Sequence, residues 1–203
     1  MHVNSREAAI SLLANPRSAK RRSGAKWLRK HPDPENVDAL IAALTKELRD
    51  LRTWETQYQM IMALGASGSD RVTHVLEAAL RLPVEPMVRL AVGDALVRLS
   101  DDVDGALIDA LESSSSFRVE GALRALAMTH RAPEKATTAA AVVDFVTRPA
   151  NAQLRFWLAA SAAGWEPSYV REFLDSCLLD SNEDLRRAAE ASLQRSYLKW
   201  NPL

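Results

Sequence analysis

The strongest constraint on the fold is a nine-residue pattern that recurs along the chain at nearly constant spacing. In most copies a Gly or Ala stands four or five places in, and an apolar residue ends the pattern. The copies are KRRSGAKWL (20–28), TQYQMIMAL (56–64), VRLAVGDAL (88–96), RVEGALRAL (118–126), LRFWLAASA (154–162) and LRRAAEASL (185–193). Their last residues lie 36, 32, 30, 36 and 31 positions apart. A period of roughly 20 to 50 residues indicates stacked structural repeats.

The segments between the turns predict helices. Ala and Leu predominate over the residues typical of strands, and short polar or proline-containing stretches separate the segments. We expect a first helix over 4–14 and a last one over 183–198, with no room for a sheet. Between them we expect the pairs 17–30 with 35–50, 54–65 with 70–81, 86–99 with 103–113, 116–130 with 134–147, and 150–163 with 168–179.

These copies resemble the HEAT-like repeat family, particularly the short bacterial type also seen in phycobilisome lyase subunits. The resemblance is carried by VR at 88–89, by LR at 154–155 and 185–186, by the small residues that follow, and by ALG at 63–65. Gln57 and Val119 depart from the usual Arg. The resemblance covers about Arg17 to Lys199. It implies an all-α, right-handed α–α superhelix of about five helical hairpins plus capping helices.

The same resemblance implies one repeat domain over residues 1–203. Residues 1–16 would form an N-terminal capping helix, residues 17–182 the hairpin repeats, and residues 183–203 a C-terminal capping helix and tail. HEAT-like arrays serve many roles, so the fold alone does not assign a function.

Composition points to a cytoplasmic protein. Apolar residues make up 47% and charged residues 26% of the chain, and no apolar run approaches the ~20 residues that cross a bilayer. The first residues lack the pattern of an export signal. The single cysteine, Cys177, allows no internal disulfide, and its helical position predicts a buried small apolar side chain.

Charge is unevenly distributed although the net charge is zero. Residues 1–30 hold eight basic side chains against Glu7 alone, whereas residues 85–120 are acidic. Five of the basic residues form a candidate anion-binding cluster: Arg17, Lys20, Arg21, Arg22 and Lys26. In the family, Arg21, Arg89, Arg155 and Arg186 resemble a structural ladder that pairs with acids of adjacent repeats. The isoelectric point of 6.9 disfavours nucleic acid as a partner, since nucleic-acid-binding domains commonly exceed about 9.

No catalytic motif, cofactor loop or metal-ligand set stands out. The four histidines lie far apart, and no His-Glu dipeptide is present, unlike in the HEAT-fold metal hydroxylases. We therefore predict no catalytic residue, no cofactor and no metal site. By resemblance the alternatives are a HEAT-fold nucleic-acid-binding protein or DNA glycosylase-like enzyme, and a phycobilin-lyase-like subunit.

A non-enzymatic module for protein–protein interaction fits the sequence best. In HEAT-like arrays the second helix of each pair lines the concave surface. Placing residues at about 100° intervals puts a mixed apolar and charged row opposite the core stripes of the predicted second helices. This candidate row is Lys46, His74, Arg81, Ile108, Asp109, Glu112, Phe145, Arg148, Glu172 and Leu179. The acidic middle favours a basic protein partner, for which a toxin-neutralising immunity protein is a special case; no oligomeric state is indicated.

Overall fold

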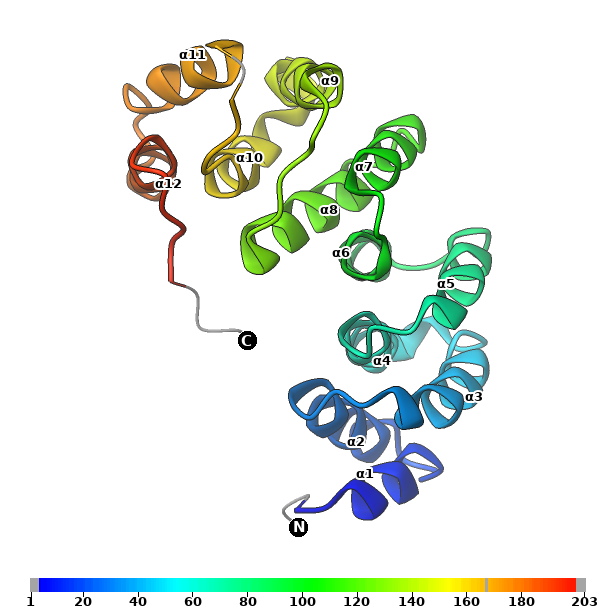
Figure 1. Cartoon of the computed structure of the whole chain (residues 1–203). Coiled ribbons are helices and arrows are strands. Elements are labelled where there is room, and N and C mark those ends of the chain that lie inside the picture. The colour runs from blue at the N-terminus through cyan, green and yellow to red at the C-terminus, as the bar shows by residue number, and fades with distance from the viewer. Residues whose placement is uncertain (1–3, 167, 200–203) are drawn as a thin grey trace. The chain divides into compact units, whose positions relative to one another are not determined.

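The computed structural model describes residues 4–166 and 168–199, and every regular element among them is a helix (Figure 1). The α-helices are α1 (Arg6–Leu13), α2 (Ser18–Lys30), α3 (Val37–Glu47), α4 (Trp54–Ala66), α5 (Thr73–Leu80), α6 (Pro86–Leu99), α7 (Val103–Glu112), α8 (Ser116–Thr129), α9 (Ala136–Thr147), α10 (Arg155–Ser161), α11 (Ser168–Cys177) and α12 (Glu183–Leu193). Short 3-10 helices at Pro34–Asn36, Leu51–Thr53, Asp70–Val72 and Pro149–Leu154 lead into α3, α4, α5 and α10. The prediction of an all-α fold is confirmed.

Two predicted helices differ most from the observed ones. The last helix ends at Leu193 and not at 198, because Arg195 adopts a left-handed φ of 55° and the Ser196 N–H bonds back to the Ala191 carbonyl. Such a backbone closure stops a helix regardless of the residues that follow. The predicted helix over 150–163 begins as a 3-10 turn, and its α-helical part covers only Arg155–Ser161.

The chain divides into two compact units, Met1–Ser100 (unit 1) and Asp101–Leu203 (unit 2). Unit 1 carries 15 basic and 11 acidic side chains, for a net charge of +4, and unit 2 carries 11 basic and 15 acidic ones, for −4. The single repeat domain over 1–203 stays a prediction.

Consecutive helices pack most closely as α1/α2, α3/α4 and α5/α6 in unit 1, and as α7/α8, α9/α10 and α11/α12 in unit 2. These pairs are shifted by one helix from the predicted ones, so α1 is the first helix of a repeat and α12 the second helix of another. The recurring motif lies in α2, α4, α6, α8, α10 and α12. It marks one helix per repeat, but it does not tell whether the partner helix precedes or follows.

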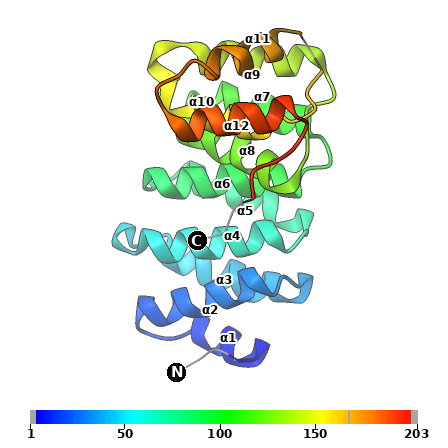
Figure 2. The same ribbon diagram turned by 90° about the vertical axis from the view of Figure 1, so that its left-hand side faces the viewer.

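Each unit has two layers of helices. We call the second helices of the pairs the B layer (α2, α4, α6 in unit 1; α8, α10, α12 in unit 2) and the first helices the A layer (α1, α3, α5; α7, α9, α11). Figure 2 shows the B-layer helices α2, α4 and α6 of unit 1 stacked one above the other. A Cβ on Gly65 of α4 would lie 2.7 Å from the Ala95 Cα atom of α6. Gly65 and Ala95 therefore let the B-layer helices α4 and α6 approach closely.

The core lies between the two layers of each unit. In unit 1 the central helix α4 buries Met60, Ile61 and Leu64 completely. In unit 2 the Cys177 side chain is fully buried, which confirms its predicted role as a small apolar core residue. Burial raises the pKa of the Cys177 thiol, although the neighbouring Arg155 acts in the opposite direction.

Candidate functional site

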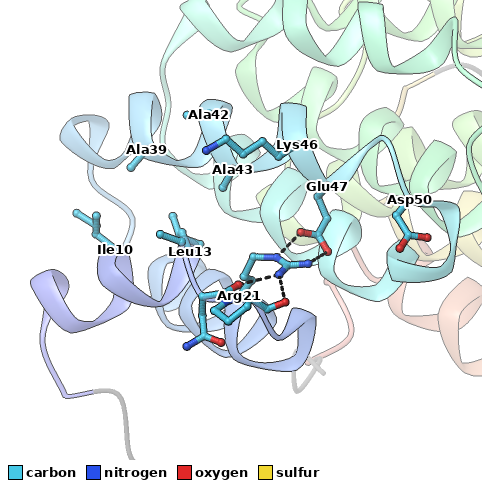
Figure 3. A pocket seen from close by; sticks show the side chains of 12 residues that line it. Ile10, Leu13, Arg21, Ala39, Ala42, Ala43, Lys46, Glu47 and Asp50 are labelled. Atoms are coloured by element: carbon cyan, nitrogen blue, oxygen red, sulfur yellow. Dashed lines mark hydrogen bonds and ion pairs between the residues drawn. The ribbon is translucent and has the colours of Figure 1, made fainter.

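The A layer of unit 1 contains two grooves, one between each successive pair of its helices. The first groove, of about 510 Å³, lies between α1 and α3 (Figure 3). Its apolar wall combines side chains from both helices that range from buried to exposed, namely Ile10, Leu13, Ala39, Ala42 and Ala43. In Figure 3, Ile10 and Leu13 of α1 point toward the alanines of α3. The groove exists because α1 and α3 touch only lightly while both pack on B-layer helices.

An ion pair closes one end of the first groove. The Arg21 Nη2 donates to Glu47 Oε1 at 2.8 Å, and the Arg21 Nε donates to the other carboxylate oxygen. The Ser18 hydroxyl donates to Glu47 as well, at 2.9 Å. Burial disfavours the charged carboxylate of Glu47, but hydrogen bonds led by that of Arg21 outweigh it and hold the pKa of Glu47 below its ordinary value. Glu47 is therefore an anion held in place by α2.

The free cation of the first groove is Lys46. Its ammonium group is exposed and has no ion-pair partner among the described residues. Asp50 also lines the groove, but hydrogen bonds from the Arg52 side chain and backbone lower the pKa of Asp50 to about 2. Asp50 is thus already paired, and Lys46 is available to an incoming anion.

The second groove, of about 440 Å³, lies between α3 and α5. Its wall is almost entirely apolar: Leu48, Val75, Ala78, Ala79 and Leu82 line it together with Thr45 and Arg49. The Leu82 side chain is 40% exposed, so its apolar surface is accessible to a partner in the groove. Arg49 is exposed and has no ion-pair partner in the described part of the chain.

The structure places the candidate row on the A layer and not on a concave B layer, which corrects the predicted location. In unit 1 the B-layer helices lie closer together than the A-layer helices, so the B layer occupies the inner side of that unit's curve. The error follows from the one-helix shift in the pairing. Lys46 lines the first groove, and His74 and Arg81 lie exposed on α5 and just after it.

The unit 2 residues of the row lie on or just after the A-layer helices of that unit. The carboxylates Asp109, Glu112 and Glu172 are exposed, and Ile108 is half-buried on α7.

Phe145 and Arg148 of the row do lie together. The Arg148 guanidinium lies 5.6 Å from the centroid of the half-buried Phe145 ring and also pairs with Asp144. The Leu179 side chain, just beyond α11, is 89% exposed.

The predicted anion-binding cluster loses two members to internal ion pairs. The Arg21 guanidinium pairs with Glu47 and donates to the carbonyls of Asn15 and Pro16, and Arg22 pairs with Glu55. Three exposed or half-buried cations have no ion pair within the described ranges: Arg17, Lys20 and Lys26.

The predicted pairing of the arginine ladder with acids of adjacent repeats is found at two positions, Arg21 with Glu47 and Arg155 with Asp180. Arg186 donates to the carbonyls of Asp180 and Ser181, which matches the Arg21 bonds to the preceding turn. Arg89 shows no comparable partner among residues 4–166 and 168–199.

Sequence reasoning missed a half-buried carboxyl in unit 2. Burial raises the pKa of Glu120 on α8, against a hydrogen bond from Trp157 of α10. The Arg124 guanidinium lies 5.7 Å from the centroid of the Trp157 ring. The only signal in the sequence was the motif copy that contains Glu120, which did not show that Trp157 would lie beside it.

Within residues 4–166 and 168–199, no group of three or more His, Cys, Asp or Glu side chains is arranged to hold a metal ion. No helix in this part of the chain has both the length and the apolar character that crossing a membrane requires.

Comparison with known proteins bears on unit 1. The family model described as HEAT repeats matches residues 6–97. This range runs from the start of α1 to the last turn of α6, so it coincides with the three helix pairs of unit 1. No curated protein matches the chain.

Proposed function

Because residues 6–97 belong to the HEAT-repeat family, whose members commonly act as protein-interaction scaffolds, we propose that this chain is a non-enzymatic protein-binding module with a contact surface on the A layer of unit 1. One observation carries the proposal. Two neighbouring grooves of about 510 and 440 Å³ have apolar walls, and each has a free cation, Lys46 or Arg49, on its lining. An apolar centre with a charged rim is typical of protein-binding surfaces.

The second groove is the better anchor point. Leu48, Val75 and Leu82 are all partly exposed in the free chain, so filling the groove would remove their apolar surface from water. Burying apolar area is worth about 25 cal/mol per Å² before the cost of association is subtracted. The walls are helices packed on the core, so little order has to be gained on binding.

The rim charges define the kind of segment that fits unit 1. Lys46, Arg49 and Arg81 are exposed and unpaired among the described residues, whereas Glu77 is the comparable exposed acid on α5. An apolar segment flanked by acidic residues would therefore be favoured at this surface.

In unit 2 we keep the candidate row as a second contact surface, for a basic partner. Asp109, Glu112 and Glu172 are exposed acids, and Phe145 and Leu179 supply apolar surface. An immunity protein that covers a basic nuclease toxin in a bacterial cytoplasm is one special case of such a surface.

The experiment compares two leucines of equal exposure. Leu82 lines the second groove and Leu51 does not, although both are 40% exposed. We expect a pull-down from the native cell to lose its partner with Leu82→Asp and to retain it with Leu51→Asp. Equal capture by the wild type and both variants would refute the groove as the contact surface. In unit 2, Phe145→Asp tests the candidate row in the same way. If this variant still captures the partner, the candidate row is not a contact surface.

Nucleic-acid processing is the second candidate, and the contact between Glu120 and Trp157 is the observation that favours it. An aromatic side chain beside a carboxyl group is what the resemblance to HEAT-fold glycosylases would require. Against it, unit 2 has a net charge of −4, which repels a phosphate backbone. A mobility-shift assay with a short DNA duplex decides between protein binding and nucleic-acid processing. Tight binding that weakens steeply with salt concentration, and that is lost when Arg21, Arg22 and Lys26 are changed to Glu, would favour nucleic-acid processing. The phycobilin-lyase-like reading has only the shared repeats in its favour.

A further inference from the structure

We propose that the second groove of one copy of this chain binds Leu178 and Leu179 of a second copy, so that copies associate head to tail. The inference rests on the proposed binding function of the groove and names its occupant. It follows from three observations: an exposed apolar projection on unit 2, opposite charge on the two surfaces, and a groove of adequate size.

The projection consists of Leu178 and Leu179, which follow the last turn of α11. Leu179 is 89% exposed and Leu178 is 38% exposed, while the opposite face of α11 is buried through Phe173, Leu174 and Cys177. The backbone is fixed here, since the Leu178 N–H bonds to the Leu174 carbonyl and the Leu179 N–H to the Ser176 carbonyl. Two adjacent leucines are thus held out into solvent by an ordered turn. A partner that covers them would gain apolar burial at a small entropic cost.

The charges around the projection complement those around the groove. Residues 168–184 contain one basic side chain, Arg171, against five acidic ones: Glu172, Asp175, Asp180, Glu183 and Asp184. Asp180 is paired with Arg155, but Glu172 and Asp175 are exposed and have no ion pair among the described residues. On the groove side, Arg49 lines the groove and Arg81 is exposed next to the lining residue Leu82, and neither has an ion pair among the described residues. Opposite charges around an apolar contact guide association and disfavour other orientations.

The groove is large enough for the projection. A cavity of about 150 Å³ lined by aliphatic and aromatic groups accommodates a benzene molecule. The second groove measures about 440 Å³ and has an apolar wall from Leu48, Val75 and Leu82. Two leucine side chains therefore fit it in size and in polarity.

This contact joins two different surfaces, which determines how association proceeds. Each copy that uses its groove still has a free projection, and each copy that uses its projection still has a free groove. Such a heterologous contact builds chains of copies, or rings where the rotation closes. Association should increase with concentration and pass through dimers to longer assemblies.

The first experiment measures the assembly state of the full chain by sedimentation velocity over protein concentrations from about 1 μM to about 1 mM, where weak to moderate contacts are populated. We expect concentration-dependent association of the wild type. Leu179→Asp and Leu82→Asp should each raise the dissociation constant by roughly tenfold or more, because each places a charge in the apolar contact. Leu51→Asp, matched to Leu82 in exposure, should associate as the wild type does. Circular dichroism verifies that each variant is folded.

The second experiment tests the head-to-tail arrangement by mixing variants. Leu179→Asp retains an intact groove and Leu82→Asp retains an intact projection, so the mixture should form a one-to-one dimer that grows no further, while each variant alone stays monomeric. A wild type that is monomeric throughout, a mixture that does not dimerise, or association lost equally in Leu51→Asp would overturn the inference. A monomeric wild type whose pull-down partner is still lost with Leu82→Asp would overturn self-association alone and leave the proposed function standing.

Discussion

Removing the carboxylate of Glu47 should destabilise unit 1 by far more than removing an exposed acid does. The Glu47 side chain is 2% exposed and that of Arg21 is 20% exposed. In Glu47→Ala the Arg21 Nε and Nη2 donors and the Ser18 hydroxyl lose their acceptor. Breaking a buried ion pair costs about 3–5 kcal/mol. Arg21 keeps its bonds to the carbonyls of Asn15 and Pro16, so we expect the lower end, about 3 kcal/mol.

Asp38→Ala is the matched control. Asp38 pairs with Arg71 across α3 and the turn before α5, and both side chains are more than half exposed, so its loss should cost less than about 1 kcal/mol. Urea unfolding followed by circular dichroism gives both values, and hydrogen exchange of the α2 and α3 amides localises the change to unit 1. If Glu47→Ala costs no more than Asp38→Ala, the ion pair does not hold α2 and α3 together.

The same pair makes unit 1 sensitive to acid. The folded-state pKa of Glu47 lies below its ordinary value of 4.5, so folding is coupled to its ionised form. Its contribution is complete above pH 4.5 and is lost as the pH falls through the folded-state pKa. The free-energy difference between the wild type and Glu47→Gln should therefore shrink on acidification below about pH 4.5. A difference that is constant from neutral to acidic pH would contradict this coupling.

Three further predictions test the packing. Gly65→Ala should destabilise unit 1, because a Cβ placed 2.7 Å from the Ala95 Cα atom costs about 1–3 kcal/mol, while the helix propensity gained is about 1 kcal/mol. Thermal unfolding measures this loss, and the double variant Gly65→Ala with Ala95→Gly should recover part of it. Asp104→Ala should cost about 1–3 kcal/mol in urea unfolding, because the buried Asp104 carboxylate accepts two backbone N–H bonds just before α9. The Cys177 thiol is fully buried and its pKa is raised by burial, so a chromogenic disulfide reagent should label the native chain far more slowly than the chain unfolded in urea.

Local signals in the sequence located the helices well, because the residues that start and stop a helix act within a few positions. Ser115 accepts a hydrogen bond from the Arg118 N–H at the start of α8, as the serine-rich turn before it indicates. Asp33 and Pro34 likewise begin the turn into α3. The end of α12 was missed because it depends on the left-handed backbone of Arg195, a residue that does not favour that conformation.

The site was only partly predictable, because its key contacts join residues that are distant in sequence. Glu47 is 26 positions from Arg21, and the first groove becomes visible only when α1 and α3 lie side by side. The helical period placed Lys46 and Leu179 on the solvent side, and both are exposed. The same period could not tell the A layer from the B layer, since both have one buried and one exposed face.

The grooves on the A layer follow from small residues on the opposite layer. Gly65 and Ala95 bring α4 and α6 together on the B side, whereas the A-layer helices α3 and α5, which pack on α4 and α6, are packed less closely against each other. The gap between α3 and α5 is therefore as much a consequence of a glycine on α4 as of the residues that line it. A larger residue at position 65 would push the B-layer helices apart, bring the A-layer helices together and reduce the groove. Binding at the second groove should accordingly be weakened by Gly65→Ala, a substitution at a position that does not line the groove, whereas a groove defined by its lining alone would bind unchanged.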